Sequence, residues 1–413
     1  MSLLRRRAAT VALPREVWVL AAVAFAVAVG FGVVAPAIPV YARHFGVGRT
    51  AAGAVVSAFA FMRLVSALAS GRLVNRIGER LVLAVGIGIV AVSSALAGLA
   101  QTYLQLILLR GIGGVGSAMF TVSAISLLLR VADEDQRGRA TGVWQSGFLL
   151  GAIAGPAIGG PLTDISLRAP FFVYAATLAA AGSIALVFLS RADLHDAVDP
   201  DKQPPPSLRL PQALRVSGYR AALTSNLGSG WATFGVRSSL IPLFVTEGLG
   251  ASGTWTGIGF FVSAAAQGAL LLVAGGIADR RGRRPSMIAG GSFAAVAMLM
   301  VAVGQSLPVY VVAMALFGVG AAFLSVAPSA AVGDVVSGRG GTVIAAFQMS
   351  SDLGAVAGPL VAGWLSDTYS FGAAFGVTAG VLAAGVLSAV LSTETRHRPH
   401  AEAETEPAAG TTG

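Results

Sequence analysis

The sequence predicts an all-α integral membrane protein, with twelve transmembrane helices in two pseudo-symmetric six-helix bundles. Three observations predict it: an apolar composition, twelve long apolar runs and an internal repeat. Of the 413 residues, 55% are hydrophobic and 11% are charged, whereas roughly a quarter are charged in a typical soluble domain. A soluble globule would need more polar surface to cover its core. The composition therefore excludes a soluble enzyme and a disordered protein as descriptions of the whole chain.

The apolar runs are long enough to span a bilayer, whose core of about 30 Å requires roughly 20 apolar residues per helix. We place them at 16–40, 51–73, 81–100, 103–130, 141–164, 170–190, 219–246, 253–277, 286–305, 308–330, 342–366 and 370–391. The first run follows a basic N-terminus but is longer than the apolar region of a signal peptide. We therefore interpret it as a retained helix.

The distribution of basic residues predicts the orientation. With the N-terminus placed in the cytoplasm, 22 of the 28 Lys and Arg residues fall in cytoplasmic loops and termini, and 3 fall outside. The remaining 3 are Arg63, Arg110 and Arg237, inside helices. This asymmetry predicts that both termini are cytoplasmic, and we expect a multi-pass protein of the plasma membrane. The net charge of +9 then reflects topology, and a nucleic-acid partner is not expected.

Composition also divides the chain into domains. Residues 1–190 form the first predicted bundle and residues 219–391 the second. Between them, residues 191–218 form a predicted cytoplasmic linker, stiffened by the run Pro204–Pro206. Residues 392–413 are acidic and polar, and we expect a disordered cytoplasmic tail.

The two halves repeat each other in register. Offsets of 203 residues relate Phe31–Val33 to Phe234–Val236, Ile38-Pro39 to Ile241-Pro242, Gln145 to Gln348, Gly155-Pro156 to Gly358-Pro359, and Asp164 to Asp367. An offset of 204 relates Gly71 and Gly78 to Gly275 and Gly282. Such a duplication predicts a substrate site between the halves, near the middle of the membrane.

Catalytic and metal chemistry find no support in the sequence. The chain has no cysteine and four histidines, three of them in polar stretches, so we expect no disulfide, no thiol catalysis and no metal site. It contains no phosphate-binding GxxxxGK[ST] loop and no recognisable nucleophile–base pair. We therefore expect neither an enzyme nor a cofactor.

A glycine- and arginine-rich loop pattern occurs once in each half. The second copy consists of Gly275, Asp279, Arg280, Gly282, Arg283 and Arg284. The first consists of Gly71, Asn75, Arg76, Gly78, Glu79 and Arg80. The glycines permit a tight turn. A plain basic loop would be the simpler interpretation, but the doubled copy favours a functional motif.

Three helices carry further patterns. The fifth run contains Gly147, Gly151, Gly155, Pro156, Gly159 and Gly160. Small residues at every fourth position form a flat groove for close helix packing, and a proline can bend the helix. The fourth run contains the pattern Arg110-x-x-x-Gly114-x-Gly116. The first run contains Gly30, Pro36 and Pro39, where the prolines would equally serve to end the helix.

Together these motifs resemble the major facilitator superfamily and, more narrowly, its twelve-helix drug/proton antiporter branch. The resemblance covers the chain except for the linker and tail. It implies the major facilitator fold and secondary transport by alternating access, with the proton gradient as energy source. It further implies that the loop motifs latch the halves on the cytoplasmic side, that Arg110 takes part in proton transfer, and that the fifth-helix motif marks an exporter. Asn75 replaces the aspartate usual in the first loop, which weakens the latch expected there.

We therefore expect proton-coupled efflux of small amphipathic molecules or drugs. The expected partners are a small-molecule substrate, protons and the lipid bilayer, and the expected state is a monomer. One alternative is an uptake symporter or facilitator for a sugar or organic acid. An alternative of another class is a non-transporting membrane receptor.

Charged residues inside the helices indicate the mechanism. Arg63 lies 8 residues before Gly71, about 12 Å into the membrane, and Asp352 lies 10 residues after Thr342, about 15 Å in. In the implied fold their helices are neighbours across the boundary between the halves, so these side chains would meet. Desolvation favours a protonated carboxyl group and a nearby arginine favours the charged one. The hypothesis is that Asp352 switches protonation to couple proton entry to substrate exit, and the alternative is a static pair.

Other polar and aromatic side chains are candidates for a substrate cavity. Gln348 shares a helix face with Asp352, and the repeat adds Gln145 and Gln267. Arg237 would bind an anionic or polar substrate group, or else extend to the outer interface. The aromatic candidates, which would equally face lipid, are Trp144, Phe148, Trp231, Phe234, Phe260 and Phe261. Asp164, Asp367 and Glu247 are expected at outer helix ends, simply solvated.

Overall fold

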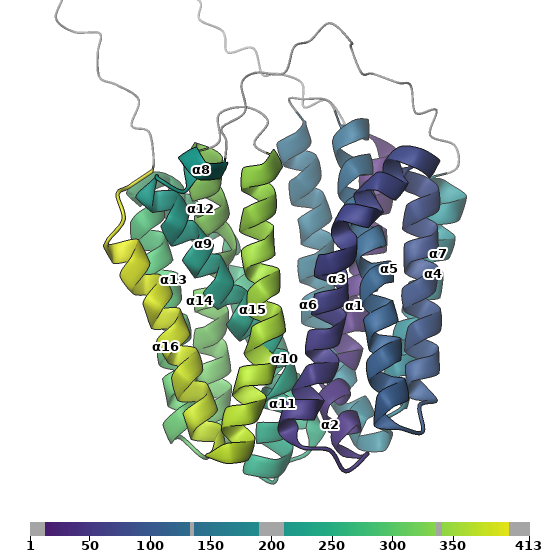
Figure 1. Cartoon of the computed structure of the whole chain (residues 1–413), viewed down its shortest axis with the longest axis vertical. Helices are drawn as coiled ribbons and strands as arrows, with labels where there is room; N and C mark the ends of the chain where they lie inside the picture. Colours follow the sequence, from purple (N-terminus) through teal and green to yellow (C-terminus); the bar gives the residue numbers. More distant parts are fainter. Residues whose placement is uncertain (1–12, 133–135, 190–209, 336–340, 396–413) are drawn as a thin grey trace, which may run out of the picture.

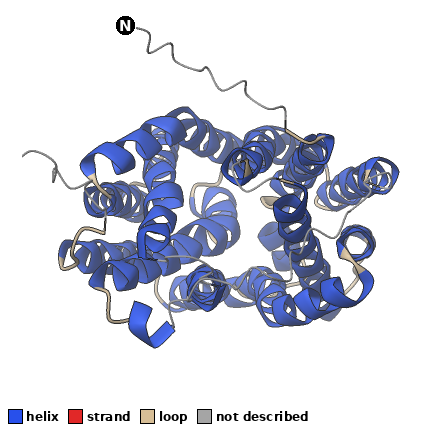
Figure 2. Cartoon of the chain, turned by 90° about the horizontal axis from the view of Figure 1, so that it is seen from above, coloured by secondary structure: helices blue, strands red, loops and turns tan. Residues whose placement is uncertain are grey.

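The computed structural model describes residues 13–132, 136–189, 210–335 and 341–395. Over these residues the chain forms helices joined by short loops and no strand (Figure 2). Most of the predicted linker (191–209) and most of the predicted tail (396–413) lie outside the described residues. The predicted all-helical fold is confirmed.

The helices follow the predicted runs closely. The first half contains α1 (Arg15–Val34), α2 (Ala37–Arg43), α3 (Arg49–Ile77), α4 (Glu79–Gly98), α5 (Tyr103–Val131), α6 (Arg137–Ile165) and α7 (Ala169–Phe188). The second half contains α8 (Leu210–Ala213), α9 (Ser217–Ser229), η1 (Gly230–Val236), α10 (Arg237–Ser239), α11 (Ile241–Leu243), η2 (Phe244–Gly248), α12 (Gly253–Arg281), α13 (Arg283–Val303), α14 (Leu307–Val335), α15 (Gly341–Thr368) and α16 (Phe371–Val390). With α1 and α2 counted as one, 10 of these are long and apolar enough to cross a membrane. α15 and the chain from α9 to η2 complete the twelve predicted spans.

The repeat seen in the sequence is present in the backbone. α3 and α12 are both 29 residues long, as are α5 and α14, and each pair starts 204 residues apart. Glycines with positive φ, a conformation that side chains disfavour, recur at the same offset. They are Gly46 and Gly250 (φ 75° and 62°) and Gly78 and Gly282 (φ 87° and 117°).

Two predicted spans are not continuous helices. The first run breaks between Val34 and Ala37, and the seventh is divided by two π-helical segments, η1 and η2. Prolines, which lack a backbone N–H and disturb the preceding turn, stand at both places: Pro36 and Pro39 in the first run, Pro242 in the seventh. Both predicted spans therefore contain an interruption, although Arg15–Arg43 still has the length and composition of one membrane span.

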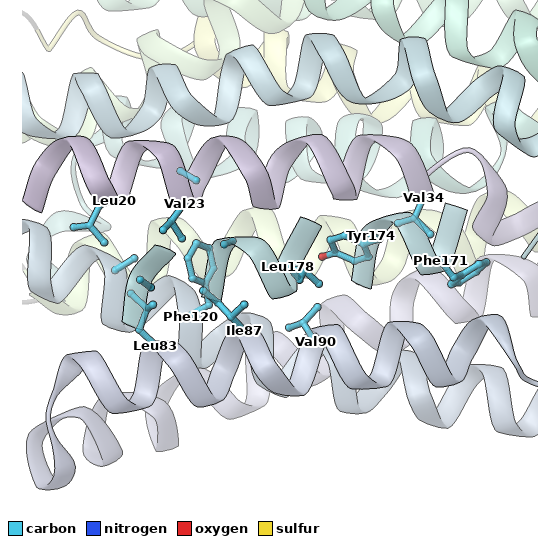
Figure 3. Close-up of a cluster of buried hydrophobic side chains, with 14 of the residues drawn as sticks. Leu20, Val23, Val34, Leu83, Ile87, Val90, Phe120, Phe171, Tyr174 and Leu178 are labelled. Carbon is cyan, nitrogen blue, oxygen red and sulfur yellow. The ribbon is translucent and has the colours of Figure 1, made fainter. Parts of the chain in front are cut away.

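Each half has its own apolar core. In the first, Leu20 and Val23 of α1 pack with Leu83 and Ile87 of α4 and with Leu178 of α7, all at most 1% exposed (Figure 3). Buried residues of η1, α12 to α14 and α16 form a separate cluster in the second half. Because each half packs around its own core, the two halves form two bundles, which lie side by side in Figure 1.

α1 begins and α16 ends at the same end of the molecule, the top in Figure 1. We call this end the terminal side. The opposite end, where α2, α10 and α11 lie, is the distal side (Figure 1).

Candidate functional site

The bundles meet along two symmetric helix pairs, α3 with α15 and α6 with α12. Proline and glycine make both contacts close. A Cβ added to Gly257 of α12 would lie 2.5 Å from the carbonyl oxygen of Pro156, and one added to Gly53 of α3 would lie 2.5 Å from that of Pro359. Backbone therefore rests on backbone across each pair, and the two contacts are related by the repeat.

The glycine pattern of α6 serves two partners. Gly147, Gly151, Gly155 and Gly159 face α1 inside the first bundle, where any added Cβ would collide with α1 backbone or Ala28. Gly160 faces the other bundle, because a Cβ there would lie 2.8 Å from Cα of Gly257. The predicted groove thus packs α1 on one face, while Pro156 and Gly160 contact α12.

Aspartates close the distal side by capping helices of the opposite bundle. Asp164 at the end of α6 accepts hydrogen bonds from the backbone N–H groups of Gly253 (2.5 Å) and Thr254 (2.9 Å) at the start of α12. Asp367 at the end of α15 accepts them from Arg49 (2.9 Å) and Thr50 (2.8 Å) at the start of α3. The hydroxyl groups of both threonines also donate to these carboxylates. A helix N-terminus offers unpaired N–H groups and a positive dipole end, so it suits a carboxylate.

An ionic cluster reinforces this closure. Glu247 of the second bundle pairs with Arg43 (2.7 Å) and Arg49 (2.9 Å) of the first. The guanidinium of Arg49 also donates to the carbonyl oxygen of Ser366 and lies over the ring of Phe371. The expectation that Asp164, Asp367 and Glu247 are simply solvated was therefore wrong, because each bonds the other bundle.

Toward the terminal side the second interface pair opens. An added Cβ at Gly268 of α12 would be in contact with Ile153 and Leu149 of α6. One turn further on the same helix face, Leu272 is 87% exposed. A shallow hollow of about 480 Å³ lies against this part of α12 alone, lined by Leu272, Val273, Gly276, Ile277, Arg280 and Arg281. The distal side is thus closed, whereas the face of α12 that contacts α6 at Gly268 is exposed one turn nearer the terminal side.

Arg63 and Asp352 meet within the first interface pair, nearer the terminal side than the contact of Gly53 with Pro359. A guanidinium N–H of Arg63 on α3 donates to a carboxylate oxygen of Asp352 on α15. Their side chains remain 31% and 21% exposed. Nearer the distal side, Ser57 donates to the carbonyl oxygen of Val356 (2.7 Å). The predicted meeting of Arg63 and Asp352 is confirmed.

The three glutamines occupy related places. Gln348 is exposed on α15, one turn before Asp352, and Gln145 is exposed on α6, one turn before Leu149. Gln267 is half-buried on α12, beside Gly268. All three lie on the helices that form the two interface pairs.

The other two intramembrane arginines point into their own bundles. Arg110 is 3% exposed, and its guanidinium lies over the ring of Phe59, 4.5 Å from the centroid. Arg237 donates to the Ser263 hydroxyl (3.3 Å) and lies 4.7 Å from the centroid of the Phe260 ring. The Nε atoms of both arginines are buried without a hydrogen-bond partner. Arg237 therefore turns inward and does not reach the outer surface.

The aromatic candidates separate into buried and exposed sets. Trp144 is 6% exposed within the first core and stacks edge-on with Phe148. Trp231 donates to the Thr378 hydroxyl of α16 (3.3 Å), so it packs inside the second bundle. Phe260 is 1% exposed beneath Arg237, whereas Phe234 and Phe261 are 48% and 40% exposed. A role in lining a cavity stays a prediction for this set.

The loop motifs sit at the terminal ends of α3 and α12, and the bonds described for them lie within single bundles. Arg80 donates to the carbonyl oxygen of Leu186 (3.1 Å), and its repeat equivalent Arg284 donates to that of Val390 (2.5 Å). Asn75, Arg76, Asp279 and Arg280 are exposed there. Gly71 and Gly275 are half-buried near the ends of α3 and α12, and Gly78 and Gly282 make the turns. The latch between the halves stays a prediction.

Each loop motif contains one residue that forms an ion pair with a helix end, and the acidic and basic partners exchange places between the two halves. Glu79 pairs with Arg130 at the end of α5 (3.0 Å), whereas Arg283 pairs with Asp334 at the end of α14 (3.0 Å). Each residue of the second pair lies 204 positions after its counterpart in the first pair: Arg283 after Glu79, and Asp334 after Arg130. Arg283 also pairs with Asp279, and Glu394, after α16, accepts hydrogen bonds from the backbone N–H groups of Arg283 and Arg284.

Sequence reasoning missed the aspartate caps and the reversed ion pair. A signal for the caps was present, because Asp164 and Asp367 are 203 residues apart while Thr50 and Thr254 are 204 apart. Polar residues that recur at helix ends with the repeat offset indicate a symmetric contact.

Comparison with known proteins agrees with this architecture. Residues 20–238 and 223–412 both match the Major Facilitator Superfamily. The quinolone resistance protein NorA of Staphylococcus aureus is 28% identical over 182 residues, 44% of this chain and 46% of NorA. Multidrug resistance protein 1 of Bacillus subtilis is 29% identical over 160 residues, 39% and 41% of the two chains. The chain thus spans less than half the length of the curated relatives it matches.

A solved structure extends the likeness to the whole fold. A bacterial homologue of the human lysosomal transporter Spinster superposes with a TM-score of 0.68 at 15% identity, covering 91% of this chain and 94% of the homologue. With both halves matching the same family and twelve spans in two related bundles, this chain belongs to the Major Facilitator Superfamily of membrane transporters.

Proposed function

We propose that the protein is a secondary active transporter that exports small amphipathic molecules or drugs in exchange for protons. The relatives NorA and Multidrug resistance protein 1 carry resistance to quinolones and to multiple drugs in their names, and the glycine pattern of α6 supports export. We further propose that it is a monomer in the plasma membrane. We place its terminal side in the cytoplasm, since the basic residues gather on that side.

The observation that carries the proposal is the Arg63–Asp352 pair. It joins α3 to α15 across the bundle boundary, so separating these helices would break it. A carboxylate released from its arginine in a desolvated place binds a proton more readily. Loss and recovery of the pair would therefore couple protonation of Asp352 to the movement of the bundles.

Alternating access requires both sides of the substrate site to open in turn. The structure is closed on the distal side by capping bonds and ion pairs, and Leu272 on the terminal part of α12 is exposed. With the terminal side in the cytoplasm, this is a state that receives substrate from within the cell. Arg237 and the three glutamines are candidates for the substrate path, and Arg110, 3% exposed, is a candidate for the proton path.

The test is transport by the full chain in proteoliposomes with an imposed pH gradient. A susceptibility panel in a pump-deficient host first identifies an exported compound. Asp352→Asn should abolish gradient-driven export of that compound while leaving counterflow exchange intact, and Glu16→Gln, at the start of α1, should leave both unchanged. Unimpaired gradient-driven export by Asp352→Asn would remove the coupling role, and protection against no compound would remove the drug-export role.

A further inference from the structure

The interior of the membrane-spanning region carries an uncompensated positive charge. Away from the helix ends, the charged side chains of the described spans are Arg63, Asp352, Arg110 and Arg237. Arg63 and Asp352 neutralise each other in an ion pair. Arg110 and Arg237 form no ion pair within the described chain and contribute two positive charges.

Both guanidinium groups have unused hydrogen-bonding capacity. A guanidinium has five N–H donors, yet Arg237 makes one described hydrogen bond, to Ser263, and its Nε is buried without a partner. Arg110, 3% exposed, has an unpartnered Nε as well. The rings of Phe59 and Phe260 offer each cation a favourable face but carry no compensating negative charge.

Arg237 lies next to the boundary between the bundles, and Arg110 lies one helix away from it. α10, which carries Arg237, packs against α2 and α3 of the first bundle. α5, which carries Arg110, packs against the same α3, and Phe59 of α3 lies beneath Arg110. In Figure 1, α10 lies between α15 and α3, at the boundary between the bundles.

Electrostatics then favours one class of ligand. A charge held inside a membrane without a partner is costly and indicates function, and a guanidinium suits oxyanions such as carboxylates. A cationic ligand at Arg237 would meet an unpaired like charge, and the interior carboxylate of the described spans, Asp352, is already paired with Arg63. Such a site discriminates against cations by repulsion as well as attracting anions.

We propose that the substrate is an organic anion and that Arg237 binds its anionic group. Arg237 is the partly exposed arginine of the two and therefore makes the direct contact. This inference rests on the proposed transport of small molecules, and it is independent of proton coupling.

The test uses three pyrene probes that share a butyl chain and end in a carboxylate, a hydroxyl or an ammonium group. Their affinities for the purified full-length protein in detergent are compared by fluorescence polarisation. We expect the carboxylate probe to bind about tenfold more tightly than the ammonium probe, a difference typical of one charge-assisted contact. Because this comparison uses the unaltered protein, it does not depend on any variant folding.

Variants then assign the preference to Arg237. Arg237→Gln should weaken binding of the carboxylate probe about tenfold and that of the hydroxyl probe less than about threefold, whereas Arg237→Lys should retain part of the preference. The matched control is Arg72→Gln, which removes an exposed positive charge from the terminal end of α3 and should change nothing. Thermal melting of each variant confirms folding.

The proposal is overturned if the carboxylate probe binds no more tightly than the ammonium probe, including the case in which neither binds. It is also overturned if the preference survives in Arg237→Gln. Vesicle transport separates it from the proposed function. Preferential binding of the anion without any transport would contradict the transport function alone, and transport without charge preference would contradict this inference alone.

Discussion

The Arg63–Asp352 ion pair matters more for its position between the bundles than for its contribution to the free energy of folding. The two side chains are 31% and 21% exposed, and partly exposed ion pairs contribute at most about 1 kcal/mol to stability. Such a pair can be broken and remade in a transport cycle, whereas a fully buried one would resist separation. The same exposure leaves a route by which a proton can reach Asp352.

Exchanging the two charges distinguishes a coupling pair from a static one. The double variant Arg63→Asp/Asp352→Arg should recover most of the thermal stability that either single change loses, because opposite charges again face each other. It should not recover gradient-driven transport, because the carboxylate then stands on α3, in a different environment. Melting temperature and proteoliposome transport are measured on both single variants and the double. Full recovery of pH-driven transport would show that the pair only holds the bundles together.

The sequence located this pair but not the orientation of the aromatic residues. Helical rise alone placed Arg63 and Asp352 at similar depths, because a charged residue within an apolar run has a definite distance from the membrane surface. Trp231 follows no such rule, since it stands in the π-helix η1, where the usual angular spacing of side chains is lost. Its packing against Thr378 of α16 depends on tertiary structure.

At the scale of elements, the distal side is closed by helix ends. The ends of α6 and α15 carry the carboxylates, and the starts of α12 and α3 carry the N–H groups. Each pair crosses the bundle boundary, so capping energy that usually stabilises a single helix here stabilises one conformation of the molecule. These contacts could not be predicted by inspecting one helix at a time, because donor and acceptor lie on different bundles.

Removing the aspartate caps should therefore open the distal side. Loss of a capping side chain costs about 1 kcal/mol, so Asp164→Ala/Asp367→Ala should shift the equilibrium toward a distally open state by roughly 30-fold. The chain has no native cysteine, so spin labels on Ile165→Cys and Tyr369→Cys, which are 81% and 69% exposed in the parent chain, report the distance between the distal ends.

A cap within one bundle provides the matched control. Thr102 accepts a hydrogen bond from the N–H of Gln105 at the start of α5, so Thr102→Ala should lower the melting temperature without lengthening the label distance. An unchanged distance distribution in the double aspartate variant would show that the remaining interface, including Glu247 with its arginines, holds the distal side closed without the caps.

At the scale of the whole molecule, the repeat conserves contacts more strictly than it conserves residues. The pair Glu79–Arg130 and the pair Arg283–Asp334 occupy equivalent positions with opposite polarity. Likewise, Arg80 donates to the carbonyl oxygen of Leu186, and Arg284 donates to that of Val390. Both donor and acceptor of the second bond lie 204 residues after those of the first. Sequence comparison of the halves detects glycines and prolines because backbone geometry restricts them. It overlooks a reversed ion pair, because neither member is identical to its counterpart.

This symmetry predicts that the Glu79–Arg130 pair of the first bundle can be reversed to the order found in the second bundle, with the basic residue at 79 and the acidic residue at 130. Glu79→Arg should lower the melting temperature, because the 11% exposed Glu79 side chain loses charge-assisted hydrogen bonds worth about 1.5–3 kcal/mol and a positive charge faces Arg130. Adding Arg130→Glu should restore most of the loss, since the double variant reproduces the arrangement of Arg283 and Asp334. Adding Arg72→Glu, at an exposed position on α3, should not restore it. A reversed pair no more stable than Glu79→Arg alone would show that each bundle has fixed the polarity of its own pair.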